Sequence, residues 1–68
     1  MSVYYVNKNP QVNGDHEVHK QGCNYMPDDL NKVYLGDYLS CRSAVTKALE
    51  FYSKSNGCFH CSEECHTS

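Results

Sequence analysis

The C-terminal tail of the chain concentrates residues that bind metal ions. From Gly57 to His66 the sequence reads GCFHCSEECH, which holds three of the five cysteines and two of the four histidines. Cys58 and Cys61 form a Cys-x-x-Cys pair, and one turn of backbone can aim both sulfurs at a common point. Such a pair suits a tetrahedral ion such as Zn²⁺. Two ligands are half of a zinc site, so the other half must come from further residues.

Two sets of residues are candidates for the remaining ligands. The local set is Cys65 with His66 or His60, which would close the site within the tail. The distant set is His19 and Cys23, spaced His-x₃-Cys. The distant set is physically better because it would clamp both ends of the fold together, and adjacent Cys65 and His66 cannot easily face one ion. The predicted metal ligands are therefore His19, Cys23, Cys58 and Cys61, with Cys65 or His66 as alternatives. Two other roles stay open for Cys65, a spare thiol or a disulfide partner.

The length of the chain makes a covalent or metal staple necessary on energetic grounds. Residues 1–68 correspond to one domain, near the lower limit of what folds alone. A domain of this size buries only about 60% of the surface that its unfolded chain exposes. The five cysteines are odd in number, so they cannot all pair internally. No signal peptide or membrane-spanning stretch is visible, and we therefore expect a cytoplasmic protein with metal-bound thiolates rather than disulfides.

Three segments have the composition of β-strands. Residues 3–6 are β-branched and aromatic, residues 16–20 alternate, and residues 32–36 form a third candidate. Asn13-Gly14 is a tight-turn signal, so the first two strands are expected to pair antiparallel. Alternation places Glu17 and His19 on the same face of their strand. The sequence predicts an α+β fold with an antiparallel three-stranded sheet.

One segment has the period of an amphipathic helix. Ser40 is a suitable N-cap, and Ser55-Asn56-Gly57 is expected to stop the helix, which gives a span of 41–54. The apolar residues on one helical stripe include Cys41, which we expect to be a small buried thiol. Residues 59–65 are expected to form a short C-terminal helical turn. The full stripe is Cys41, Ala44, Val45, Ala48, Leu49 and Tyr52.

The charge of the chain disfavours a nucleic-acid binder. Six basic residues against eight acidic ones give a net charge of −2, and the basic residues are scattered. Nucleic-acid-binding proteins usually carry a clustered basic surface. Several tyrosines cannot all be buried, so an exposed tyrosine face for another protein is the first expectation. These tyrosines are Tyr4, Tyr5, Tyr25, Tyr34 and Tyr38.

Two reactive roles for the cysteines are weaker alternatives. A catalytic zinc keeps one coordination position open for water, whereas four protein ligands close the site. Glu63 and Glu64 would act on a bound water only if His19 were not a ligand. A Cys-x-x-Cys redox pair is usually found near a βαβ unit, which this sequence does not show. A monomeric structural-zinc module without catalysis is therefore the predicted class.

The order of ligands and elements resembles the Ada-type metal-binding domain, the zinc domain of the bacterial DNA-alkylation repair protein Ada. The resemblance covers roughly residues 15 to 62 and depends on His19-x₃-Cys23, Tyr34-Leu35-Gly36, a helix with Ala44 and Ala48, and Gly57-Cys58-x₂-Cys61. It implies a bacterial zinc domain with His19, Cys23, Cys58 and Cys61 as ligands, and it makes DNA or RNA the second candidate partner. In Ada the first ligand is a cysteine that accepts a methyl group. His19 stands at that position here and has no thiolate to alkylate.

Overall fold

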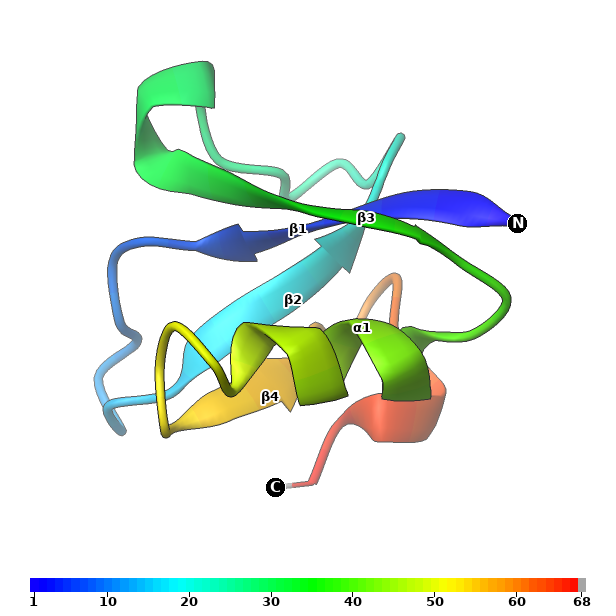
Figure 1. Cartoon of the computed structure of the whole chain (residues 1–68). Coiled ribbons are helices and arrows are strands. Elements are labelled where there is room, and N and C mark those ends of the chain that lie inside the picture. Colours follow the sequence, from blue (N-terminus) through cyan, green and yellow to red (C-terminus); the bar gives the residue numbers. More distant parts are fainter. Residues whose placement is uncertain (68) are drawn as a thin grey trace.

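The computed structural model describes residues 1–67, so residue 68 of the predicted domain lies outside the described part. The fold is α+β, with one α-helix lying against a twisted sheet (Figure 1). No helix in residues 1–67 is long and apolar enough to cross a membrane. The elements in chain order are β1 (Ser2–Asn7), β2 (His16–Lys20), the 3-10 turn η1 (Asp29–Asn31), β3 (Lys32–Tyr38), α1 (Cys41–Ala48), β4 (Ser55–Gly57) and the 3-10 turn η2 (Glu63–Cys65).

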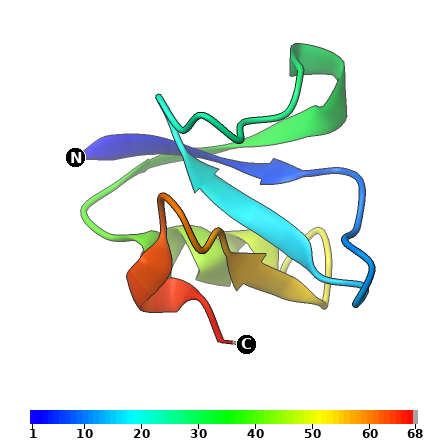
Figure 2. The same ribbon diagram turned by 180° about the vertical axis from the view of Figure 1, so that it is seen from behind.

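The sheet has the order β3-β1-β2-β4 and is mixed. The three predicted strands are present, and β1 pairs antiparallel with both β2 and β3. The expectation of a purely antiparallel three-stranded sheet is wrong, because β4 adds a fourth strand parallel to β2. Figure 2 shows the arrows of β2 and β4 running in the same direction. A three-residue polar strand has no alternating pattern, so only its pairing with β2 makes it a strand.

Helix α1 is shorter than its apolar period predicts. It begins at Cys41 after Ser40 as expected, but it ends at Ala48 rather than near residue 54. The next residues form tighter turns, with Glu50 N–H donating to the carbonyl of Lys47 and Phe51 N–H to that of Ala48. Leu49, predicted to be on the buried stripe, is 47% exposed. The helix stops early because the chain must reverse to bring β4 alongside β2.

The core between α1 and the sheet is built from small and medium side chains. The sheet contributes Tyr4, Val6 and Val18, and the helix contributes Ala44 and Ala48, both completely buried. Alanine on the inner face lets the helix approach the strands closely, so a short helix can still exclude water. The remaining core members are Leu35 from β3 and Cys41 from the start of α1.

A disulfide bond joins Cys41 to Cys65, across 24 positions of sequence. The expectation of a free buried thiol at Cys41 is therefore wrong, and so is the expectation that disulfides are absent. Cys23, Cys58 and Cys61 are free cysteines, as metal binding requires. The tail folds back so that η2 packs on α1, which brings the two cysteines to a Cα separation of 6.2 Å. Gly57 permits this approach, since a Cβ there would lie 2.7 Å from the Cβ of Cys65.

Breaking the Cys41–Cys65 bond should destabilise the fold. Closing a loop of 24 residues removes unfolded-state entropy equivalent to about 3 kcal/mol. The variant Cys41→Ala/Cys65→Ala should therefore lower the free energy of unfolding by about 3 kcal/mol, measured by urea denaturation. Because alanine also removes buried sulfur, reduced wild-type protein is the matched control. If the reductant left its unfolding midpoint unchanged, the two sulfurs would not be bonded in the folded protein.

Candidate metal site

The parallel pairing of β2 with β4 brings two distant parts of the sequence together. Glu17 is opposite Asn56 and Val18 is opposite Gly57. The ladder continues one step further, because the N–H of Cys58 donates to the carbonyl of Val18 at 2.9 Å. Cys58 is therefore held beside the C-terminal end of β2, where His19 lies.

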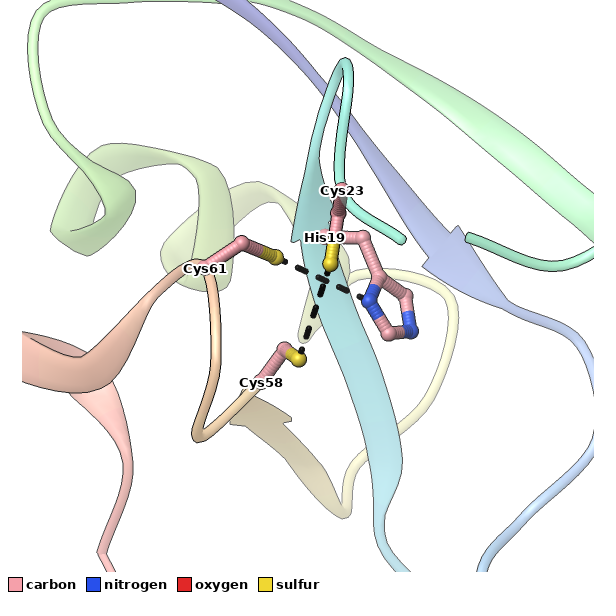
Figure 3. A group of neighbouring side chains, drawn as sticks. All are labelled: His19, Cys23, Cys58 and Cys61. Carbon is pink, nitrogen blue, oxygen red and sulfur yellow. Dashed lines mark hydrogen bonds between the residues drawn. The ribbon is translucent and has the colours of Figure 1, made fainter. Parts of the chain in front are cut away.

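A tight turn after β2 returns Cys23 to the same place. Gly22 has a φ of +94°, a left-handed conformation that glycine adopts without steric cost. The N–H of Cys23 then donates to the carbonyl of Lys20 at 3.1 Å. Figure 3 shows Cys23 on the loop that leaves β2, with its sulfur directed toward the other three side chains.

The tail forms a second turn that positions Cys61. The N–H of Ser62 donates to the carbonyl of Cys58 at 2.8 Å, which closes the Cys-x-x-Cys segment into one turn. The backbone N–H of Lys20 donates to the sulfur of Cys61 at 3.3 Å. An N–H donor of this kind stabilises negative charge on a sulfur, so β2 contributes to the site through its backbone as well as through His19.

The four side chains converge on one small volume (Figure 3). One potential ligand atom from each of His19, Cys23, Cys58 and Cys61 lies within 4.8 Å of the other three. Sγ of Cys23 is 4.0 Å from Sγ of Cys58, and Sγ of Cys61 is 3.8 Å from Nδ1 of His19. Tetrahedral zinc with bonds of about 2.3 Å separates its sulfurs by about 3.8 Å. The spacing therefore fits a shared ion and is much too long for a Cys23–Cys58 disulfide.

Burial sets the protonation of the metal-free cluster. His19 and Cys58 are each 1% exposed. Burial lowers the pKa of His19, so its imidazole is neutral at pH 7 and keeps a lone pair for a metal. Burial also raises the pKa of Cys58, and it raises that of Cys61 to about 12, with a further contribution from hydrogen bonding to Cys23. Thiolates at these positions require a nearby cation. A divalent ion that accepts both sulfur and nitrogen ligands, such as Zn²⁺, fits three sulfurs and one imidazole.

Glu17 is a further member of the site that the prediction of ligands missed. Nδ1 of His19 faces Cys61, so Nε2 is the nitrogen left to interact with the surrounding protein. Nε2 is buried without a hydrogen-bond partner among residues 1–67, and the nearest acidic oxygen, Oε1 of Glu17, is 3.7 Å away. Metal-binding histidines commonly direct their second nitrogen at a carboxylate. The signal was present in the sequence, since alternation places Glu17 and His19 on one face.

The alternative ligands are engaged elsewhere. Cys65 is bonded to Cys41, and Nδ1 of His66 lies 3.1 Å from the carbonyl oxygen of Gly57. His60 stacks on Tyr25 at a ring-centroid distance of 4.0 Å. The structure thus brings together the distant set of predicted ligands and gives the local set other contacts.

Comparisons with protein-family models, curated proteins and solved structures found no match to this chain. The function must therefore be argued from the site itself.

Replacing Glu17 tests the orientation of His19. We expect Glu17→Gln to weaken zinc binding by about 10- to 100-fold, because the carboxylate that polarises the imidazole is lost while its shape is kept. The measurement is competition with a chromophoric zinc chelator. Glu50→Gln is the matched control, since Glu50 is exposed in the turn after α1 and its carboxylate pairs with Lys47. Equal affinities for the two variants would show that Glu17 does not support His19.

Proposed function

We propose that this protein is a structural-zinc module that acts in protein recognition, as a monomer and without catalysis. The observation that carries the proposal is the convergence of His19, Cys23, Cys58 and Cys61 within 4.8 Å. These residues come from β2, the loop after it and the tail, so one ion would connect segments far apart in sequence. Structural zinc contributes roughly 10–16 kcal/mol in small zinc-finger peptides, which exceeds what a thin core can supply.

The composition of the cluster favours a structural role over a catalytic one. Four nitrogen and sulfur ligands complete a tetrahedral shell and leave no position for a substrate water. The two carboxylates that follow Cys61 in sequence, Glu63 and Glu64, are exposed in η2. When zinc is bound, it supplies cross-linking of the fold and neutralises most of the charge of three thiolates.

Exposed aromatic rings beside the cluster support recognition of another protein. Tyr25 is 58% exposed and Phe59 is 53% exposed. Both rings contact His60, Tyr25 by stacking and Phe59 edge-on at 5.4 Å between centroids. Aromatic side chains of this kind are enriched at protein interfaces. The ligand cluster would hold both halves of this surface in place, since Tyr25 follows Cys23 and Phe59 follows Cys58.

One observation favours nucleic acid as a second candidate partner, in line with the resemblance to Ada. Tyr5 and Tyr34 lie edge-on with centroids 5.8 Å apart, and the ammonium of Lys32 is 4.6 Å from the centre of the Tyr5 ring. Rings with an adjacent cation can stack on bases and contact phosphates. Lys32 also pairs with Asp29 at 3.2 Å, which offsets its charge. Salt-sensitive binding of a labelled oligonucleotide, weakened by Lys32→Ala, would favour this second function.

The cysteines bear on the cellular compartment in two ways. The Cys41–Cys65 disulfide is typical of oxidising compartments, and free thiols at Cys23, Cys58 and Cys61 are typical of reducing ones. Zinc coordination occupies the thiolates, so the two states can coexist in one molecule. The cytoplasm remains our prediction for the metal-bound protein.

Removing single candidate ligands tests the zinc assignment. We expect wild-type protein to hold about one equivalent of zinc and His19→Ala to lose most of it, with a lower melting temperature. His66→Ala is the matched control and should keep its zinc, because His66 contacts the Gly57 carbonyl instead. Metal analysis after gel filtration provides the measurement. Zinc retained by His19→Ala but lost from His66→Ala would show that the fourth ligand lies in the tail and that His19 is not a ligand.

Zinc binding should release protons. Cys58 and Cys61 have raised pKa values, that of Cys61 at about 12, so both are protonated thiols at pH 7 without metal. Zinc must displace both of these protons, so its affinity should fall at least about 100-fold for each unit by which the pH is lowered. Calorimetry in buffers of different ionisation enthalpy should detect about two or more protons released per zinc. Release of fewer than about one proton would show that the thiols are not the ligands.

A further inference from the structure

A pocket lies directly beside the candidate metal site. Its volume is about 370 Å³, and Cys61 forms part of its wall. The sheet contributes Tyr4 and Lys20, the segment that enters α1 contributes residues 39–41, and the tail contributes residues 60–64. The pocket therefore depends on the same folding-back of the tail that assembles the ligand cluster.

Tyr4 lines this pocket and has a hydroxyl without a hydrogen-bond partner in the described part of the chain. Tyr4 is 5% exposed, and its ring belongs to the core. Cys61 and Glu64 line the same pocket as Tyr4. Burial raises the pKa of Tyr4, so its hydroxyl is neutral at pH 7. A neutral hydroxyl in this position can accept a hydrogen bond from a guest.

The pocket wall carries excess negative charge. Glu63 and Glu64 are exposed, and neither takes part in the ion pairs formed within residues 1–67. Lys20 is the only lysine or arginine in the wall. Three thiolates and one divalent ion would add a further net charge of −1 behind Cys61. A cationic guest is favoured by this arrangement, and an anionic guest is repelled.

The number and placement of the acceptors select the kind of cation. Two carboxylates and the Tyr4 hydroxyl require several donors on one group, and a guanidinium presents five in a planar fork, whereas an ammonium presents three. Leu39 lines the pocket, is 86% exposed and offers an apolar surface for an aliphatic stem. We propose that this pocket binds an arginine side chain of a partner protein, an inference that rests on the proposed role in protein recognition.

Nuclear magnetic resonance titration of the zinc-loaded full chain tests the proposal. The probe is Nα-acetyl-arginine amide, and Nα-acetyl-citrulline amide is its neutral counterpart of nearly equal shape. We expect saturable shifts at residue 4 and residues 60–64 with a Kd on the order of 1 mM, which is usual for a single side chain. Citrulline amide should give at least about five-fold weaker binding, since it lacks the charge. Equal shifts with both probes would overturn the proposal.

Three variants assign the binding to the pocket. Glu64→Gln and Tyr4→Phe should each weaken arginine amide binding about three-fold or more, because each removes one acceptor or its charge while keeping the shape. Glu50→Gln, in the exposed turn after α1, should bind as wild type. Unchanged affinity in both pocket variants would overturn the proposal.

Zinc content measured on the same samples distinguishes failure of the arginine pocket from failure of the proposed zinc site. A protein with one equivalent of zinc that does not bind arginine amide would overturn the pocket assignment alone. A protein that fails to take up zinc but still binds arginine amide would retain the pocket and overturn the zinc module.

Discussion

The parallel contact between β2 and β4 is the constraint on which the rest of this structure depends. It is formed by only three residue pairs, but it carries the tail to the end of β2 where His19 lies. Without it, Cys58 and Cys61 would have no fixed relation to Cys23. The early end of α1 follows from the same requirement, since the chain has to turn back before residue 55 to supply β4.

The segment that follows β4 is held by one cross-link and carries residues that could form a second. The disulfide holds Cys65 against the start of α1, and a metal ion bound by the four-residue cluster would hold Cys58 and Cys61 against β2. The side chain of Asn56 adds a third attachment, because its carbonyl oxygen accepts hydrogen bonds from the backbone N–H groups of Gly57 and Thr67. The tail is thereby fastened to both the sheet and the helix, which compensates for the few large apolar residues in the core.

The parts of this fold that were predictable from the sequence are those with a local signal. The first three strands show β-branched or alternating residues, and Ser40 marks the start of α1. The spacing of His19, Cys23, Cys58 and Cys61 was sufficient to name the group that the structure brings together. β4 was not predictable, because Ser55-Asn56-Gly57 reads as a turn until a partner strand is known. The Cys41–Cys65 bond depends on the position of the tail, which no local pattern encodes.

The brevity of β4 has a consequence for strand register. A strand with alternating apolar residues fixes its own register, because a slip by one residue would move every side chain to the opposite face. Ser55-Asn56-Gly57 has no such alternation and is weakly specified by itself. Cys58 follows it directly and is joined to β2 by a single backbone hydrogen bond, from its N–H to the carbonyl of Val18. A bound ion would stabilise only the register in which Cys58 faces His19. Metal binding would therefore select one register for β4 at the edge of the sheet.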